Sequence, residues 1–337
     1  MIPENDLAAI DRRLAPLWPR LAGARVFMTG GTGLTGRWML EALARSGSDA
    51  EVAILSRDPE AFARKAPHLA ARYELVVGDV LTFVPPKGEF THVIHAATDA
   101  SADLNATDPR RMFDTIVGGT RRALDLAVTR GATRFFFLSS GAVYGPQPWE
   151  VTHVAEDWHG GPDPRDPRSA YGEGKRAAET LCAIYRKQFG LDTVTARIFA
   201  LLGPLLSLDI HFAAGNFIRD ALAGRTIRVE GSGEAVRSYL YLADLTVWLW
   251  TLLLAAEPGA TYNVGSEEAV SIAELARRTA ALLGGPGIEV LGRPDPGWNP
   301  GRYVPWTEAI RRDLNLSPTV DLDEAIRRTA RANGWTS

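Results

Sequence analysis

The stretch "RVFMTGGTGLTGRW" (25–38) decides the fold, because a short apolar run leads directly into Gly30, Gly33 and Gly36. Glycine is required where a chain turns tightly, where its backbone approaches a pyrophosphate, and where a helix packs closely on a sheet. The amides and the dipole of a helix N-terminus favour a bound phosphate. The stretch therefore predicts a strand, a dinucleotide-binding loop and a helix.

The same alternation of strand-like and helical segments continues over the first 200 residues. Short, continuously apolar strands separated by helices indicate a parallel sheet that is covered on both faces. The expected fold is a Rossmann-type doubly wound α/β sheet with a smaller C-terminal α/β lobe. The further predicted strands are 51–56, 73–79, 91–97, 134–140 and 192–199, and the longer predicted helices are 108–130 and 170–189.

The regular alternation fades beyond residue 200, where glycine and proline separate shorter elements. We predict an N-terminal helical extension (1–23), a dinucleotide-binding domain (24–200) and a smaller C-terminal lobe (201–337). Within the lobe, residues 236–256 are expected to pack back on the first domain.

Composition narrows the class of protein further. The 337 residues carry a formal net charge of −3, which gives no electrostatic reason to expect a nucleic acid or an anionic membrane as partner. The N-terminus lacks the apolar core of a signal peptide, and Cys182 is the only cysteine. Asp244 interrupts the apolar stretch 239–257, which we interpret as a buried helix rather than a membrane span. A cytoplasmic protein is expected.

The end of the second predicted strand bears on the choice of cofactor. An acidic residue there would bind the ribose 2′-hydroxyl of NAD, whereas an arginine would accommodate the 2′-phosphate of NADP. Ser56 and Arg57 occupy this place, and Asp58 follows. A hydroxyl and a guanidinium suit a phosphate, so NADP(H) is favoured and NAD(H) remains possible.

The stretch "SAYGEGKRAAE" places Tyr171 and Lys175 on one face of a predicted helix. A free tyrosine has a pKa of about 10 and is a poor base near neutral pH. A nearby ammonium favours the phenolate and lowers that pKa. Such a tyrosine can take a proton from a hydroxyl while hydride leaves the same carbon.

At this point several ordered motifs can be compared with a known family: "TGGTGLTG", "SSGAVYG", "YGEGK" and "RSYLYLADL". From about residue 24 onward the chain resembles the extended short-chain dehydrogenase/reductases, in particular their nucleotide-sugar epimerase/dehydratase branch. The resemblance implies that Ser140 binds the reacting oxygen, that Tyr171 is the acid/base, and that Lys175 holds the nicotinamide ribose. It also implies that the lobe 201–337 binds a nucleotide-diphosphate sugar, and that a homodimer forms through the helices near 108–130 and 170–189.

The resemblance extends to binding residues. Asn216, Arg237 and, less directly, Arg302 match positions that contact the substrate diphosphate. The residues expected to contact the cofactor are Gly30, Thr32, Gly33, Leu34, Thr35, Gly36, Ser56, Arg57, Asp79, Val80, Ala96, Ala97, Thr98, Ser139, Tyr171 and Lys175.

The chain departs from the family pattern at positions that bear on the reaction. Dehydratases of this family carry Asp-Glu directly after the catalytic serine or threonine, and this chain has Gly141 and Ala142. A 4,6-dehydratase is therefore disfavoured, and a 4-ketoreductase or an epimerase acting at a ring carbon, expected to be C4, stays open. Ile116 and Ala200 replace asparagines common in the family. A non-enzymatic NADP(H) sensor is the remaining alternative, and no metal site is expected, because His95 has no neighbouring ligand cluster.

Overall fold

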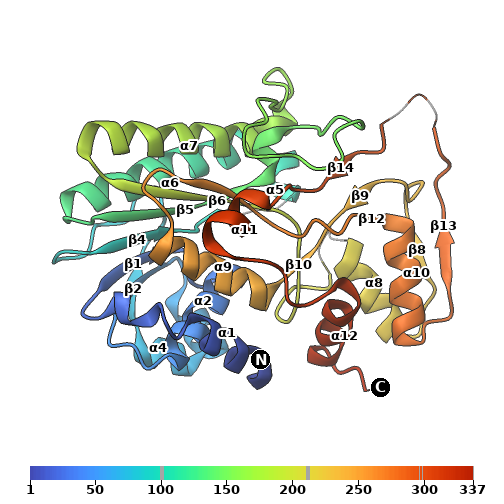
Figure 1. The fold of residues 1–337 in the computed structure, drawn as a ribbon, viewed down its shortest axis with the longest axis horizontal. Coiled ribbons are helices and arrows are strands. Elements are labelled where there is room, and N and C mark those ends of the chain that lie inside the picture. The colour runs from blue at the N-terminus through green and yellow to red at the C-terminus, as the bar shows by residue number, and fades with distance from the viewer. Residues whose placement is uncertain (99–101, 210–212, 296, 298, 337) are drawn as a thin grey trace.

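A computed structural model describes residues 1–98, 102–209, 213–295, 297 and 299–336. Its centre is a seven-stranded sheet in the order β11-β6-β5-β4-β1-β2-β3, in which all neighbouring strands are parallel. The predicted doubly wound parallel sheet is confirmed (Figure 1). The strands are β1 (Arg25–Thr29), β2 (Glu51–Ser56), β3 (Glu74–Val77), β4 (His92–His95), β5 (Arg134–Ser140), β6 (Asp192–Ile198) and β11 (Thr261–Val264).

Helices cover both faces of the central sheet (Figure 1). Three consecutive phenylalanines in β5 serve both faces, because successive side chains of a strand point in opposite directions. Phe136 packs into the hydrophobic core between the sheet and helices α2 and α9. Phe135 and Phe137 pack into the core between the sheet and helices α6 and α7. The covering helices are α1 (Glu4–Leu14), α2 (Leu34–Arg45) and α9 (Leu242–Ala255) on one face and α6 (Pro109–Thr129) and α7 (Ala170–Phe189) on the other.

Shorter helical segments connect these elements. Two of them border the candidate site: η2 directly follows β5, and η3 directly precedes α7. The segments are α3 (Pro59–Lys65), α4 (Pro67–Arg72), α5 (Ala102–Thr107), α11 (Glu308–Leu314), η1 (Trp18–Leu21), η2 (Gly141–Tyr144) and η3 (Pro167–Ser169).

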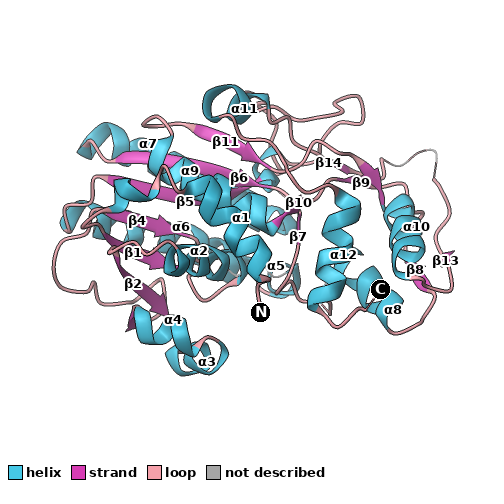
Figure 2. Cartoon of the chain, turned by 60° about the horizontal axis from the view of Figure 1, so that its bottom comes forward, coloured by secondary structure: helices cyan, strands magenta, loops and turns pink. Residues whose placement is uncertain are grey.

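Most elements beyond residue 200 form a smaller lobe beside the carboxyl ends of the strands of the central sheet (Figure 2). It contains three small sheets, β10-β7, β12-β9-β14 and β13-β8. β11 is different, because it pairs with β6 and completes the central sheet. The division at residue 200 stays a prediction. The lobe elements are α8 (Ala213–Leu222), α10 (Ile272–Leu283), α12 (Leu322–Ala332), β7 (Leu201–Leu202), β8 (Ile227–Val229), β9 (Val236–Arg237), β10 (Leu240–Tyr241), β12 (Val270–Ser271), β13 (Ile288–Val290) and β14 (Arg302–Tyr303).

The apolar stretch around residue 244 forms α9, which is buried from Leu242 through Leu254. Its position between α1, α2 and the central sheet explains why it is apolar on all sides. None of the helices in the described part of the chain is long and apolar enough to cross a membrane.

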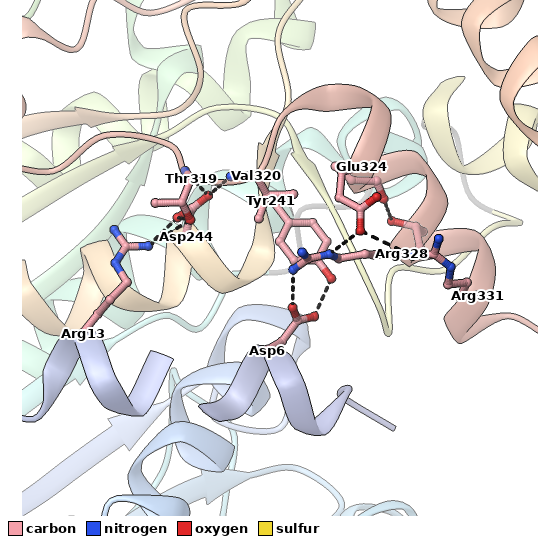
Figure 3. A network of polar contacts seen from close by, with 11 residues as sticks. Asp6, Arg13, Tyr241, Asp244, Thr319, Val320, Glu324, Arg328 and Arg331 are labelled. Carbon is pink, nitrogen blue, oxygen red and sulfur yellow. Dashed lines mark hydrogen bonds and ion pairs between the residues drawn. The ribbon is translucent and has the colours of Figure 1, made fainter. Parts of the chain in front are cut away.

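Helix α1 is fastened to both the start of α9 and the C-terminal helix α12 (Figure 3). The fully buried carboxylate of Asp6 accepts hydrogen bonds from the Tyr241 hydroxyl at 2.5 Å and from Arg328 at 2.7 Å. Arg13 donates to Asp244 at 2.5 Å, and Asp244 also accepts from the backbone amide of Thr319 at 2.8 Å. We call these two sets of contacts the N-terminal clasp.

Candidate active site

The glycine loop between β1 and α2 is too crowded for side chains at two of its glycines. Gly30 has a φ of +73°, and a Cβ there would lie 2.5 Å from the carbonyl carbon of Ala96. A Cβ at Gly36 would collide with the carbonyl oxygen of Gly30. The loop therefore packs directly against the end of β4, as a dinucleotide-binding loop requires.

The N-terminus of α2 fits a phosphate group. Gly33 precedes the helix, and no side chain caps its first-turn amides. By contrast, Asp58 caps α3 and Asp108 caps α6. Thr32 and Gly33, which lead into this turn, are exposed, and Leu34 and Thr35 are half-buried. Uncapped amides at a helix start can bind a ligand oxygen. The residues present therefore fit the pyrophosphate of a dinucleotide.

The end of β2 presents the residues predicted to contact the adenosine ribose. Ser56 is buried, and its hydroxyl accepts a hydrogen bond from the amide of Asp58 at 3.2 Å. The carboxylate of Asp58 accepts from the amide of Ala61 at 2.8 Å and is thereby engaged as a helix cap. Arg57 is exposed. Of the two charged residues, Arg57 has the freer side chain.

The remaining predicted cofactor residues lie at the ends of the neighbouring strands. Asp79 accepts from the amide of Leu81 at 2.9 Å, and Val80 is buried. Ala96 and Ala97 follow β4 and approach Gly30, which places them at the bottom of the same loop. The glycine loop and the ends of β3 and β4 thus meet at one edge of the sheet, the edge at which open α/β sheets bind ligands.

The predicted Ser-Tyr-Lys set comes together at the end of β5. Ser140 is the last residue of β5 and is buried. Tyr171 lies in the first turn of α7, close enough to Ser140 for the serine to act on its pKa. Lys175 donates to the carbonyl of Leu138 at 2.7 Å and to the hydroxyl of Thr98 at 2.9 Å. Thr98 directly follows Ala97, so Lys175 connects this set to the glycine loop.

Burial sets the protonation of the Ser-Tyr-Lys set. It lowers the pKa of Lys175 to about 7, because an ammonium loses its hydration in the protein interior. The carboxylate of Glu179, one turn further along α7, opposes this shift. Burial also raises the pKa of Tyr171, and the neighbouring Ser140 acts in the lowering direction. The lysine can therefore titrate near neutral pH, and the serine favours the phenolate.

Ser139 has a different partner from Ser140. Its hydroxyl donates to Glu179 at 2.6 Å, and Glu179 forms an ion pair with Arg197 at 2.7 Å. Arg197 also donates to the hydroxyl of Tyr144 at 2.7 Å. Ser139, predicted among the cofactor contacts, is thus engaged in a polar network behind the site, and its cofactor contact stays a prediction.

Gly141 lies against the ring of Phe199, and a Cβ at this position would come within 2.6 Å of a ring carbon. No side chain fits there while Phe199 keeps its position. Position 141, next to Ser140, therefore has neither an acidic side chain nor the space for one. Ala142 is half-buried and contributes its amide to Ser140 at 3.2 Å.

The C-terminal lobe brings a tyrosine into contact with Ser140 that the sequence analysis missed. The hydroxyl of Tyr303 lies 3.3 Å from the hydroxyl of Ser140. In the parallel pair of β14 and β9, Tyr303 is the register partner of Arg237. Tyr303 and Arg237 therefore share one face of this small sheet. Arg237 thus lies beside Tyr303, and its contact with the substrate diphosphate stays a prediction.

Arg302 and Asn216 have other neighbours. Arg302 precedes Tyr303 in β14 and stacks over the ring of Trp149, with its guanidinium carbon 4.5 Å from the ring centre. Its Nε is buried and, among the described atoms, has no hydrogen-bond partner. Asn216 lies in α8, where its side-chain oxygen accepts from Arg219 at 3.4 Å. The substrate contacts of Arg302 and Asn216 stay predictions.

His95 is a packed core residue, as the sequence analysis interpreted it. Its ring nitrogens contact the hydroxyls of Thr29 at 2.8 Å and Thr120 at 3.1 Å, and its ring stacks on Phe137. Burial lowers the pKa of His95 to about 3, so the ring is neutral. Across the described residues, no group of three His, Cys, Asp or Glu side chains could hold a metal ion.

This arrangement of a glycine loop, a parallel sheet and a Ser-Tyr-Lys set is matched by a family model. Residues 26–265 match the NAD dependent epimerase/dehydratase family, and the chain belongs to that family. A curated relative, the UDP-glucuronic acid decarboxylase 1 of Xenopus tropicalis, is 32% identical over 307 residues, which cover 90% of this chain and 71% of the relative. The family predicted from the motifs is confirmed.

Solved structures agree with the fold. The UDP-glucose 4-epimerase of Thermus thermophilus, solved in complex with NAD, is 25% identical with a TM-score of 0.76, covering 93% of this chain and 100% of that one. The dTDP-glucose 4,6-dehydratase DesIV of Streptomyces venezuelae is 23% identical with a TM-score of 0.78, covering 91% and 96% of the two chains. Decarboxylation was not among the reactions that the sequence analysis considered.

Proposed function

We propose that the protein transfers hydride at a ring carbon, C4, of a nucleotide-activated sugar, as a 4-ketoreductase or an epimerase. The observation that carries this proposal is the position of the buried Lys175, one turn after Tyr171 in α7, where it donates to Thr98 beside the glycine loop and to Leu138 in the strand that ends at Ser140. A polar set of this composition beside a nicotinamide serves proton transfer at a carbon that exchanges hydride.

In the proposed reaction Tyr171 takes the proton of the sugar hydroxyl, and the same carbon loses its hydride. The nicotinamide cofactor, when bound, accepts that hydride or supplies it. Ser140 donates a hydrogen bond to the reacting oxygen, and Lys175 stabilises the tyrosinate by its charge. In the direction of reduction, Tyr171 returns the proton to the oxygen of the ketone.

The two reactions differ in what happens to the cofactor. An epimerase returns the hydride to the opposite face of the same sugar and keeps its cofactor, whereas a reductase exchanges the cofactor in every turnover. The exposed Arg57 supports NADP(H), because its guanidinium is available to a 2′-phosphate while Asp58 caps a helix. An NADPH-dependent reductase is therefore the first form to test.

Arg237 is the residue proposed to bind the substrate diphosphate, since it shares a face with Tyr303 near the Ser140 set. Arginine suits this task because it stays charged and can bond two phosphate oxygens at once. Asn216 and Arg302 are proposed as further contacts. The buried, unpartnered Nε of Arg302 supports its inclusion, because such a donor needs an acceptor.

Decarboxylation of a UDP-linked hexuronate is a second candidate, favoured by the similarity to UDP-glucuronic acid decarboxylase 1. Oxidation at C4 of such a sugar makes a β-keto acid, which can lose CO₂ without an added protein acid. Gly141 and Ala142 therefore do not count against it. They do count against dehydration, because Phe199 leaves no room for an acid at position 141.

We further propose a homodimer formed through α6 and α7. These helices expose the large apolar side chains Phe113, Ile184 and Phe189. They also line a surface hollow of about 540 Å³. Replacement of Ile184 by aspartate should give a monomer in size-exclusion chromatography with light scattering, whereas an unchanged mass would exclude this surface.

The test of the catalytic proposal is incubation with NADPH or NAD⁺ and each of three sugars: a 4-keto-6-deoxy nucleotide sugar, UDP-glucose and UDP-glucuronate. Consumption of NADPH with a reduced sugar indicates a reductase. A product of unchanged mass and altered stereochemistry indicates an epimerase, and loss of CO₂ indicates a decarboxylase.

Tyr171→Phe should abolish turnover while cofactor binding persists. Tyr185→Phe is the matched control, because Tyr185 lies in the same helix and its hydroxyl bonds to Asp125 away from the site. Turnover by Tyr171→Phe at the unaltered rate would overturn the proposal.

A further inference from the structure

The side chain of Asn105 links α5 to the start of α7, the helix that carries Tyr171. Its Oδ1 accepts a hydrogen bond from the backbone amide of Tyr171 at 3.1 Å. Its Nδ2 donates to the backbone carbonyl of Arg168 at 2.8 Å. The directions of both bonds are fixed, because a backbone amide can only donate and a carbonyl can only accept. The side-chain amide of Asn105 therefore has one defined orientation.

This bridge lies where α7 lacks a side-chain cap of its own. The short helix η3 runs directly into α7 at Ser169, whose side chain makes no capping hydrogen bond. The amides in the first turn of an α-helix have no acceptor within that helix and can take one from outside. Tyr171 lies in this turn, and Asn105 supplies the acceptor from another helix. The bridge thus holds the backbone from which the side chain of Tyr171 projects.

Helix α5 is itself anchored. The amide of Asp108, directly after α5, donates to the carbonyl of Leu104 at 2.8 Å, and the carboxylate of Asp108 caps α6. Leu104 packs against the same hydrophobic core as Tyr171. The helix that carries Asn105 is therefore fixed to α6 and to the core beneath α7.

The chain that follows β4 contacts α7 at both of its predicted site residues. The hydroxyl of Thr98 accepts from the ammonium of Lys175 at 2.9 Å, and Asn105 holds the amide of Tyr171 one turn earlier. Ser140 is held separately, at the end of β5. A shift of the first turn of α7 would therefore move Tyr171 relative to Ser140.

We propose that Asn105 is a positioning residue for Tyr171, whose side-chain amide fixes the first turn of α7 and so sets the place of the tyrosine hydroxyl in the site. This inference rests on the proposed function of the Ser-Tyr-Lys set. Proton transfer needs the donor and the acceptor within hydrogen-bond reach. A misplacement of about 1 Å can lower a rate by about a hundredfold. Asn105 acts through the backbone of Tyr171.

The inference is tested with Asn105→Ala and the control Asp321→Ala. Asp321 caps α12 through the amide of Glu324 at 2.8 Å, and α12 carries no predicted site residue. Loss of either cap should lower the melting temperature by a few degrees. A cap that only stabilises its helix leaves the kcat of the folded protein unchanged, and this is the result expected for Asp321→Ala.

Asn105→Ala should also change catalysis. The substrate is whichever of a 4-keto-6-deoxy nucleotide sugar, UDP-glucose or UDP-glucuronate the parent protein converts. Asn105→Ala should lower kcat about tenfold and change KM less than about threefold, because the misplaced hydroxyl matters most in the transition state. A lower melting temperature with an unchanged kcat would overturn the role of Asn105.

A second measurement does not depend on turnover. Fluorine NMR of protein labelled with 3-fluorotyrosine reports the surroundings of each tyrosine ring, and the signal of Tyr171 is the one missing from Tyr171→Phe. That signal should move or broaden in Asn105→Ala and keep its position in Asp321→Ala. An unchanged Tyr171 signal in Asn105→Ala would overturn the role of Asn105. Failure of the parent protein to convert any of the three sugars, together with a displaced Tyr171 signal in Asn105→Ala, would overturn the proposed function alone.

Discussion

Glu179 accepts a hydrogen bond from Ser139 at 2.6 Å, so the residue beside Ser140 is tied to the helix that carries Tyr171 and Lys175. Glu179 also pairs with Arg197, and both side chains are largely buried. This pair therefore joins β5, β6 and α7 directly behind the Ser-Tyr-Lys set.

Removal of the Glu179 carboxylate should destabilise the protein. Glu179→Ala leaves the buried Arg197 without its ion partner, and we expect a loss of about 3 kcal/mol in the free energy of unfolding. Urea denaturation measures this loss. Glu173→Ala is the control, because its pair with Arg176 is more exposed and longer, at 3.7 Å, so it should cost less than about 1 kcal/mol. Equal losses in the two variants would contradict a structural role for the buried pair.

The pKa of Lys175 predicts a pH dependence of stability. Its pKa of about 7 in the folded protein lies below the ordinary lysine value of 10.5, so the unfolded chain binds the extra proton between these two values. The free energy of unfolding of the cofactor-free protein should therefore rise with pH between about 7 and about 10.5, by a few kcal/mol in order of magnitude. Denaturation of Lys175→Met should lack this rise. A parallel rise in both proteins would show that another group is responsible.

Crowding at Gly141 predicts that even a methyl side chain at this position lowers the stability of the protein. Gly141→Ala should lose about 1–3 kcal/mol of stability, because its Cβ meets the Phe199 ring. Gly231→Ala is the control, since a Cβ at that position meets nothing within 4 Å. Thermal denaturation compares the two. Gly141→Ala/Phe199→Leu should recover part of the loss, and no recovery would locate the conflict elsewhere.

Arg57 predicts the cofactor preference. Arg57→Ala should weaken NADPH binding about tenfold and leave NADH binding nearly unchanged, because only NADPH has the 2′-phosphate. Fluorescence titration with each cofactor measures both constants. Arg64→Ala removes an exposed charge from nearby α3 and controls for general electrostatics. Equal weakening of both cofactors by Arg57→Ala would refute selection through the phosphate.

The N-terminal clasp should contribute to stability. Asp6→Ala leaves the buried hydroxyl of Tyr241 without its acceptor, with an expected loss of about 2 kcal/mol. Glu4→Ala in the same helix breaks only an exposed pair with Arg45 and should cost less than about 1 kcal/mol. Chemical denaturation separates the two outcomes, and similar values would show that the clasp adds nothing.

Local patterns predicted the central sheet and most of the candidate site. The glycine loop, the strand ending at Ser140 and the helix carrying Tyr171 and Lys175 all depend on residues close together in the chain. Even the alternate directions of the three phenylalanines follow from the geometry of a strand. Such features can be predicted from the sequence because residues close together in the chain determine them.

Tyr303 could not be predicted in the same way. It lies 163 residues from its partner Ser140, in a two-residue strand surrounded by irregular chain. Its position depends on β14 pairing with β9 and on the ring of Phe199. The partners of Arg302 and Glu179 are likewise set by packing between distant elements, about which sequence periodicity says nothing.

The N-terminal clasp also bears on the order in which the chain can complete its folding. Helix α1 is synthesised before α12, yet Asp6 bonds to Arg328, which follows 322 residues later. Until α12 has been made, the carboxylate of Asp6 lacks one of the two hydrogen-bond donors that stabilise it in the protein interior. A ribosome-bound chain can therefore assemble much of the central sheet, but the contact between α1 and α12 can form only after α12 has been translated.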